Sequence, residues 1–166
     1  FKELEEVALG VGSDVPFFLS GFSCALVEGR GERIKALSVA PKPILLAQPR
    51  GYSVSTKEAY ALLDILLGKN GLGKRVPLER VLATLERESH QWGDAFFNDF
   101  EKCLHYPEFY GTIANIASKY IGYGSLSGSG SCWYFVGEND KSVVELHREL
   151  HGQFLDSVQL WCTNLI

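Results

Sequence analysis

A run of alternating serine and glycine residues is the strongest chemical signal in the chain. Residues 127–132 read Ser-Gly-Ser-Gly-Ser-Cys and stand directly before an apolar stretch. Alternating glycines let a backbone approach a ligand closely, and successive N–H groups can form a concave site for anionic oxygens. The same composition is also typical of a plain turn. The candidate anion-binding residues are Ser127, Gly128, Ser129, Gly130 and Ser131.

A single carboxylate near the start of the chain is the second candidate. Asp14 lies in Gly-Ser-Asp-Val-Pro, residues 12–16, which we interpret as a corner between a helix and a strand. A carboxylate held at a corner can act as a general base, or can position a hydroxyl group for phosphoryl transfer. It can equally cap or support the turn itself. The residues alone leave both roles open.

Two further patterns look chemical but lack a required residue. Residues 68–75 nearly match a phosphate-binding loop, but Arg75 stands where a hydroxyl must reach Mg²⁺, and a helical pattern precedes the segment instead of a strand. His147 and His151 are four residues apart, but Arg148 replaces the glutamate of the zinc-protease pattern. We therefore expect a solvated loop, a solvated helix face and no metal site.

Composition excludes several classes of protein. The 166 residues carry 16 Lys and Arg against 20 Asp and Glu, and 46% of them are hydrophobic. The acidic balance argues against a nucleic-acid-binding protein, and no uncharged stretch is apolar enough to suggest a membrane span. The four cysteines are widely spaced, as expected of a cytoplasmic protein without a disulfide framework. The chain opens with Phe1 inside a helical pattern and contains no Met, so we expect a fragment of a longer protein.

Periodicity and turn signals predict the elements that position these residues. Few strands alternate with several helices, which predicts an α+β fold with a small, mostly antiparallel sheet covered by helices on one face. Two prolines in residues 40–43 predict a boundary, and a capping box from Ser55 to Glu58 predicts a helix ending at Gly68. The predicted strands are 24–28, 34–37, 44–47, 132–136 and 157–162. The other predicted helices are a first helix that stops at Gly10 and Gly12, and helices over 78–85, 98–106, 108–120 and 142–154.

Five short motifs occur in one order with sensible spacing. They are Gly-Ser-Asp-Val-Pro-Phe-Phe (12–18), Leu-Val-Glu-Gly-Arg-Gly-Glu (26–32), Ser-Thr-Lys-Glu-Ala-Tyr (55–60), Asn-Asp-Phe-Glu (98–101) and Leu-Ser-Gly-Ser-Gly-Ser-Cys (126–132). Together they resemble the second half of the 4-diphosphocytidyl-2-C-methyl-D-erythritol kinase family, a branch of the GHMP kinases. The resemblance implies that residues 1–40 are the tail of an N-terminal, ribosomal-S5-like ATP-binding domain. It implies that residues 41–166 are the GHMP kinase C-terminal domain.

The resemblance also implies an activity and roles for particular residues. The activity is ATP-dependent phosphorylation of the 2-hydroxyl of a small-molecule substrate, 4-diphosphocytidyl-2-C-methyl-D-erythritol, in non-mevalonate isoprenoid synthesis, with ATP and Mg²⁺ as cofactors. Asp14 matches the catalytic carboxylate, and residues 127–131 match a loop near the nucleotide and substrate phosphates. Ser55, Thr56 and Tyr60 match the segment beside the substrate, where Tyr60 is expected to stack on cytosine.

Two departures from the family pattern qualify these expectations. The substrate lysine and the Pro-x-x-x-Gly-Leu-Gly-Gly-Gly-Ser-Ser phosphate loop of the family do not occur in the 166 residues, so we expect the chain alone to have no appreciable kinase activity. Residues 49–55 are two residues longer than the usual family segment. The alternatives are another GHMP kinase, of the homoserine or mevalonate type, and a non-catalytic ligand-binding or interaction domain.

Overall fold

The computed structural model describes residues 2–68, 75–103 and 106–165. The chain forms two compact units: the first runs to Pro41 and includes Leu165, and the second is Lys42–Asn164. Across the described part of the chain, no helix has the length and apolar character needed to span a membrane.

The first unit contains two helices and a hairpin. These are α1 (Lys2–Val11), α2 (Val15–Ser20), β1 (Ala25–Glu28) and β2 (Arg33–Ala36). The hairpin is confirmed, because β1 and β2 pair antiparallel from Ala25 opposite Ala36 to Glu28 opposite Arg33. The strand expected after Asp14 is wrong, because that segment is helix α2. Pro16 lies in the first turn of α2, where its fixed φ suits a helix, and Gly21 ends the helix with a φ of 71°.

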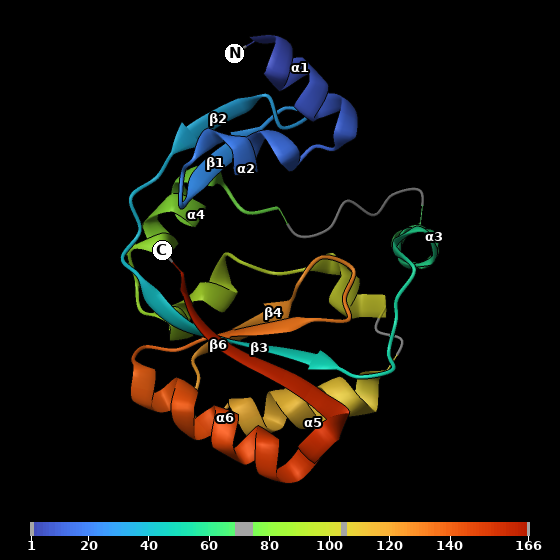
Figure 1. Cartoon of the computed structure of the whole chain (residues 1–166), viewed down its shortest axis with the longest axis vertical. Helices are drawn as coiled ribbons and strands as arrows, with labels where there is room; N and C mark the ends of the chain where they lie inside the picture. Colours follow the sequence, from blue (N-terminus) through green and yellow to red (C-terminus); the bar gives the residue numbers. More distant parts are fainter. Residues whose placement is uncertain (1, 69–74, 104–105, 166) are drawn as a thin grey trace. The chain divides into compact units, whose positions relative to one another are not determined.

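The second unit is built on a four-stranded sheet (Figure 1). Its strands are β3 (Lys42–Pro49), β4 (Tyr123–Leu126), β5 (Trp133–Val136) and β6 (Val158–Leu165), in the order β4-β5-β3-β6. Both β3 and β4 pair antiparallel with β5, which confirms the small, mostly antiparallel sheet.

The sequence patterns missed two features of this sheet. Strand β3 begins at Lys42 and runs through Pro43, although the prolines predict a break. A proline is tolerated at the start of a strand, and the Pro43 carbonyl still accepts the Gly137 N–H at 2.9 Å. Strand β4 was not predicted, since its surroundings are rich in Gly and Ser. A Cβ at Gly124 would stand 2.4 Å from the Phe135 ring, so glycine here makes room for core packing.

Helices of the second unit lie on both sides of the sheet. They are α3 (Thr56–Leu67), α4 (Leu78–Leu85), α5 (Pro107–Ala117) and α6 (Asp140–Phe154), with short 3₁₀ helices η1 (Ser89–Asp94), η2 (Asp99–Cys103) and η3 (Leu155–Ser157). The capping role of Ser55 is confirmed, because its Oγ accepts the Glu58 N–H at 3.4 Å. Within the helix predicted over 98–106, the structure has the 3₁₀ helix η2 at Asp99–Cys103, and residues 104 and 105 lie outside the described residues.

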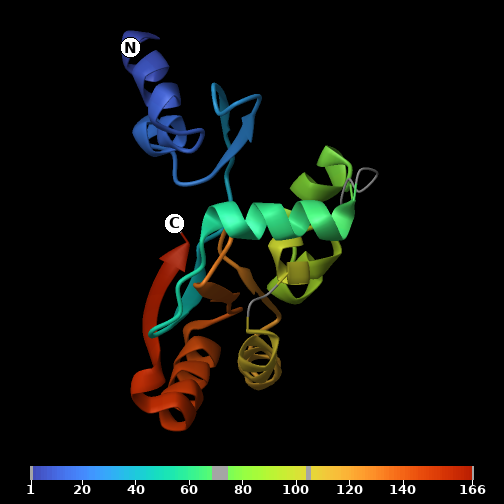
Figure 2. The ribbon, with the colours of Figure 1, turned by 90° about the vertical axis from the view of Figure 1, so that its right-hand side faces the viewer.

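The main core lies between the sheet and helices α5 and α6. The inward positions of these helices, including Ile113, Leu146 and Leu150, are fully buried against Leu45 and Phe135 of the sheet. Figure 1 shows α5 and α6 side by side on this face, and Figure 2 shows α3 on the opposite side of the sheet.

The opposite face of the sheet is also packed, in contrast to the predicted single covered face. Trp92 of η1 lies against Tyr123 of β4 and Val136 of β5, and all three side chains are buried. Phe96 and Tyr134 complete this smaller cluster. The aromatic residues after α4 therefore anchor the segment that leads into η2.

The N-cap of α6 offers a direct test of the local structure. Asn139 Oδ1 accepts the Ser142 N–H at 3.0 Å, so Asn139→Ala should lower the free energy of unfolding by about 1 kcal/mol. Asn115 is exposed within α5, and Asn115→Ala should not lower stability, because alanine favours a helix. Urea denaturation of both variants measures this, and equal stabilities would contradict the capping role.

Candidate functional site

The serine- and glycine-rich segment forms the connection between β4 and β5. The Gly130 N–H donates to the Ser127 carbonyl at 3.0 Å, and the Ser127 N–H donates to the Cys132 carbonyl at 2.8 Å. Gly128 and Gly130 have φ values of 57° and 96°, in the region that side-chain-bearing residues rarely adopt. The alternating glycines are therefore required by the shape of a closed turn. We call residues 127–131 the glycine loop.

Two residues of the Asn-Asp-Phe-Glu motif hold the first half of the glycine loop. Asn98 Nδ2 donates to the Leu126 carbonyl at 2.8 Å and to the Gly128 carbonyl at 2.7 Å. Glu101 Oε1 accepts the Leu126 N–H at 3.0 Å and the Ser125 hydroxyl at 2.5 Å. In the sequence alone, this motif contributes only to the resemblance. The available signal for these two roles was an asparagine and a glutamate spaced three residues apart at the start of a predicted helix.

Ser131 and Tyr110 hold the second half of the loop. The Ser131 hydroxyl donates to the Tyr52 carbonyl at 3.0 Å, and the Tyr110 hydroxyl donates to the Ser131 carbonyl at 3.0 Å. Ser131 is buried, so its polar atoms serve the fold. Its contact with a ligand stays a prediction.

The N-terminus of α3 lies beside the glycine loop. The Thr56 hydroxyl is 3.1 Å from the Ser129 hydroxyl, although the two residues are 73 positions apart in sequence. Ser55, next to Thr56, caps the helix. One turn later, Tyr60 is half exposed and packs edge-to-face on Phe100 of η2, with ring centroids 4.9 Å apart. The structure thus brings Ser55, Thr56 and Tyr60 to the region of the loop.

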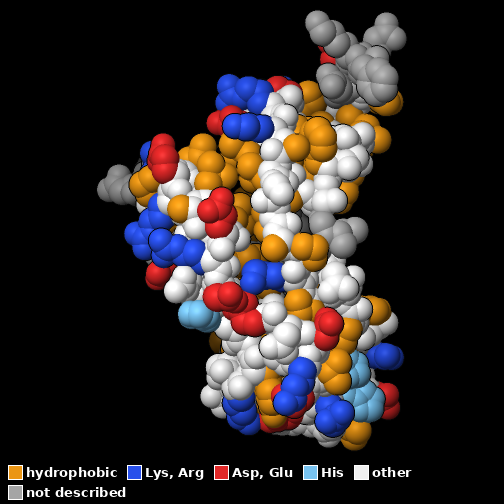
Figure 3. All heavy atoms as spheres, turned by 90° about the vertical axis from the view of Figure 1, so that its left-hand side faces the viewer, with side chains coloured by type: hydrophobic (Ala, Val, Ile, Leu, Met, Phe, Trp, Pro, Cys, Tyr) orange, Lys and Arg blue, Asp and Glu red, His pale blue; other side chains and the backbone are white. Residues whose placement is uncertain are grey.

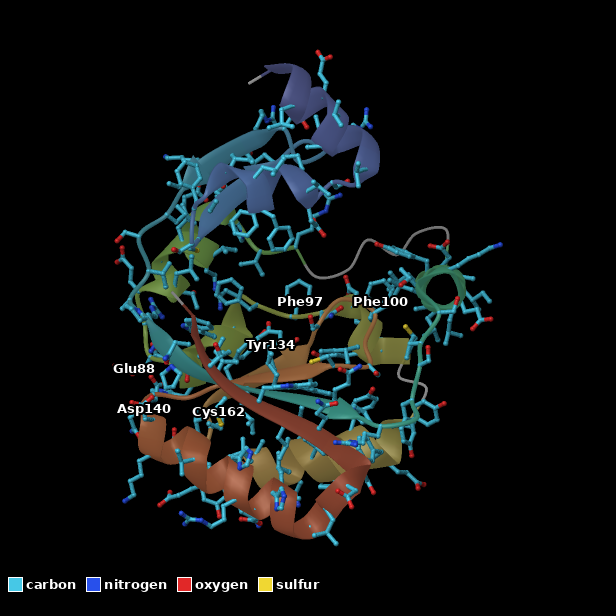
Figure 4. All side chains as sticks on the ribbon, viewed as in Figure 1. Glu88, Phe97, Phe100, Tyr134, Asp140 and Cys162 are labelled. Atoms are coloured by element: carbon cyan, nitrogen blue, oxygen red, sulfur yellow. The ribbon has the colours of Figure 1, made fainter. Side chains whose placement is uncertain are left out.

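An open cleft of about 520 Å³ adjoins the loop on the sheet face that carries η1. Ser127, Gly128 and Asp99 form part of its wall, and aromatic side chains that include Phe97 and Tyr134 form another part. Figure 4 shows Phe97 and Tyr134 on the side of the sheet away from α5 and α6. The glycine loop therefore borders a space large enough for a small molecule.

Asp14 belongs to the first unit, at the corner between α1 and α2. It occupies the N-cap position of α2, but its carboxylate accepts no capping hydrogen bond there, and the side chain is exposed. The corner is fixed from the hairpin instead. A Cβ at Gly31, where φ is 111°, would stand 2.0 Å from the Ser13 carbonyl oxygen. The segments 12–18 and 26–32 are thus packed together, and the Asp14 carboxylate is exposed to solvent.

Burial suppresses ionisation around the glycine loop. It raises the pKa of Tyr110 to about 12, with smaller increases from Cys132, Tyr106 and Tyr52. Burial also raises the pKa of the Cys132 thiol, which follows the loop. Neither group is therefore a nucleophile or base near neutral pH.

The remaining sequence candidates are the near-match to a phosphate-binding loop and the histidine pair. Residues 69–74 of the near-match to a phosphate-binding loop lie outside the described residues. The rings of His147 and His151 stack with centroids 6.1 Å apart on α6. Within the ranges that the structure describes, no three His, Cys, Asp or Glu side chains are grouped to hold a metal ion. In Figure 3, basic and acidic side chains are interspersed over the face shown.

Two glycines of the first unit form a matched pair for testing the Asp14 corner. Gly31→Ala should lower the free energy of unfolding by roughly 2 kcal/mol or more, because φ is positive and the added Cβ meets backbone. Gly10→Ala should raise it by up to about 1 kcal/mol, because Gly10 is helical with open space around it. Urea denaturation measures both, and a tolerated Gly31→Ala would contradict the close approach to Ser13.

Ionisation of the Tyr110 hydroxyl at alkaline pH should lower the stability of the folded chain. Because its pKa in the folded chain lies above the ordinary value of 10.0, its contribution to stability is complete below pH 10 and is lost as pH rises through about 12. Tyr110→Phe should cost about 1–3 kcal/mol at pH 7, because the Ser131 carbonyl loses its donor. The variant should also lose less stability than the native chain between pH 10 and 12. Parallel alkaline unfolding curves would contradict this assignment.

Comparison with known proteins places the site in context. No protein-family model matches the chain. Curated relatives named 4-diphosphocytidyl-2-C-methyl-D-erythritol kinase include those of Caldanaerobacter subterraneus and Thermotoga maritima. The former is 33% identical over 157 residues, covering 92% of this chain and 52% of the relative. The latter is 36% identical over 143 residues, covering 84% and 51%. The chain therefore spans about half the length of the curated relatives it matches.

Solved structures agree on the fold. A crystal structure of 4-(cytidine 5'-diphospho)-2C-methyl-D-erythritol kinase superimposes with a TM-score of 0.71 at 25% identity, over 97% of this chain and 56% of that one. A homoserine kinase from Cytophaga hutchinsonii, at 14% identity and a TM-score of 0.53 over 84% and 47% of the two chains, is similar in fold alone. The resemblance is thereby confirmed. Nearly the whole chain is similar to 4-diphosphocytidyl-2-C-methyl-D-erythritol kinases, and the matched part is about half the length of each relative. The fold is that of a GHMP kinase C-terminal domain.

Proposed function

We propose that this chain forms part of a kinase that transfers the γ-phosphoryl group of ATP to the 2-hydroxyl of 4-diphosphocytidyl-2-C-methyl-D-erythritol. The observation that carries the proposal is the closed glycine loop, which lies beside Thr56 and an open cleft. The names of the relatives and of the 25% identical structure support this substrate. Homoserine and mevalonate kinases, and a non-catalytic interaction domain, are the rival functions.

Phosphate binding is assigned to the glycine loop. Loops of this kind hold phosphate oxygens by backbone N–H groups, which are neutral donors in a fixed arrangement. The Gly128 and Ser129 N–H groups lie at the centre of the turn that the Gly130 N–H closes, so the turn does not use them. Phosphoryl transfer depends mainly on positioning and on neutralising charge, and fixed donors serve both needs.

Asp14 is assigned the role of the base that accepts the proton of the substrate hydroxyl. As the 2-hydroxyl oxygen forms a bond to the γ-phosphorus, the bond from that phosphorus to the bridging oxygen of ADP breaks. The hydroxyl proton passes to the Asp14 carboxylate, which is exposed and accepts no capping hydrogen bond at α2.

Tyr60 is assigned to the cytosine ring, with Ser55 and Thr56 beside the substrate. An exposed aromatic ring that is supported from behind presents a flat apolar surface, and Phe100 supplies that support. Because Thr56 adjoins Ser129, a ligand with a flat base and a phosphate can contact Tyr60 and the glycine loop together.

Mg²⁺ enters this proposal only through the resemblance. The described residues offer no grouping of acidic side chains for a metal ion, so no residue of this chain is assigned to Mg²⁺ and no step is routed through it.

A cytoplasmic location is also part of the proposal. All four cysteines are free, which is compatible with a reducing compartment.

The test joins this chain to the part of the Caldanaerobacter kinase that it does not match. The joined protein should phosphorylate 4-diphosphocytidyl-2-C-methyl-D-erythritol with ATP, whereas the 166 residues alone should not. In the joined protein, Asp14→Asn should lower kcat by about 10²-fold or more, because the amide cannot accept the proton. KM should change little, since this interaction forms mainly in the transition state.

Asp156→Asn is the matched control, because Asp156 is exposed in η3 of the second unit. It should leave both kinetic constants unchanged. Normal turnover by Asp14→Asn with lowered thermal stability would show that Asp14 is structural. Turnover of homoserine or mevalonate in preference to the proposed substrate would favour the rival kinases.

A further inference from the structure

Asn98 contacts the glycine loop through two carbonyl groups at once. Its Nδ2 lies 2.8 Å from the Leu126 oxygen and 2.7 Å from the Gly128 oxygen. We infer that Asn98 is a positioning residue that aims the Ser129 N–H at a phosphate oxygen. This inference rests on the proposed function and adds the group that sets the direction of the donor.

The direction of the Ser129 N–H follows from the geometry of a trans peptide. Across such a bond the C=O and N–H groups point in opposite directions. The peptide between Leu126 and Ser127 shows this arrangement, because its oxygen is bound by Asn98 and its N–H donates to the Cys132 carbonyl. The peptide between Gly128 and Ser129 is also trans, and Asn98 binds its oxygen as well. Its N–H must therefore point away from Asn98.

The Ser129 N–H remains available as a donor. In the part of the chain that the structure describes, no protein acceptor is recorded for it or for the Gly128 N–H. The turn is closed by the Gly130 N–H instead, and the φ of 57° at Gly128 maintains its shape. Two adjacent N–H groups at the tip of a rigid turn are suited to an anionic oxygen.

The orientation of the Asn98 amide is itself fixed. Its Oδ1 accepts the Phe100 N–H at 3.0 Å, so the donating Nδ2 must face the loop. Glu101 secures the same segment by accepting the Leu126 N–H. Without Asn98, the peptide between Gly128 and Ser129 could rotate and turn its carbonyl toward the phosphate. The partly negative carbonyl oxygen would then repel the phosphate oxygens. Asn98 thus acts on the ligand through the loop, without touching it.

The test is a titration of the ¹⁵N-labelled chain with inorganic pyrophosphate, followed by NMR. In the native chain, the Gly128 and Ser129 amide resonances should shift on binding. Asn98→Ala removes both donated hydrogen bonds without adding charge, and should weaken pyrophosphate binding at least about 10-fold, the scale expected when a charge-assisted hydrogen bond is lost. Asn98→Leu, which keeps the branched shape of the side chain, serves the same purpose if the alanine variant does not fold.

The change in the Ser129 amide shift on adding pyrophosphate is the deciding readout, because a purely structural role would lower the melting temperature and leave this ligand-dependent change intact in the folded variants. Asn115→Ala is the matched control and should bind like the native chain. If the native chain binds pyrophosphate at the loop and the folded Asn98 variants bind it equally well, the inference is overturned and the proposed function stands. If pyrophosphate does not shift Gly128 and Ser129 in the native chain, both the inference and the proposed phosphate site are overturned.

Discussion

The side-chain amide of Asn98 makes the hydrogen bonds on which the geometry of the candidate site depends. It binds the carbonyl groups on two sides of Ser127, and its own oxygen is held by the backbone of η2. A loop rich in glycine has a large conformational entropy in the unfolded chain, so such a loop adopts one shape only when specific contacts hold it. Asn98 provides these contacts at the first half of the glycine loop, and Tyr110 and Ser131 provide them at the second.

These contacts in turn depend on the packing of the second unit. Tyr110 can reach the Ser131 carbonyl because α5 is buried against the sheet, where Ile113 is fully inaccessible to solvent. On the other face, Trp92 packs against Phe96 and Tyr123, and this cluster anchors the segment that carries Asn98. The glycine loop is therefore held from both faces of the sheet. This arrangement positions a flexible sequence without any side chain of the loop entering the core, apart from Ser131.

The sequence predicted most elements because their signals are local. Ser55 and Glu58 mark a helix start through a capping box, and the hairpin around residues 29–32 has strongly patterned strands. Strand β4 could not be predicted, because the reason for Gly124 is the Phe135 ring on a neighbouring strand. Helix α2 was missed because a short apolar run fits a strand equally well. The roles of Asn98 and Glu101 are non-local, since their partners lie more than 20 residues away in sequence.

A crystal structure of the chain grown with pyrophosphate tests the central claim most directly. We predict a phosphate oxygen at about 2.7–3.2 Å from the Ser129 nitrogen, the range of an N–H···O hydrogen bond. The Gly128 carbonyl should remain on Asn98 in the same structure. Pyrophosphate bound elsewhere in the second unit, or a peptide between Gly128 and Ser129 turned with its carbonyl toward the anion, would contradict the claim that this loop is a fixed phosphate site.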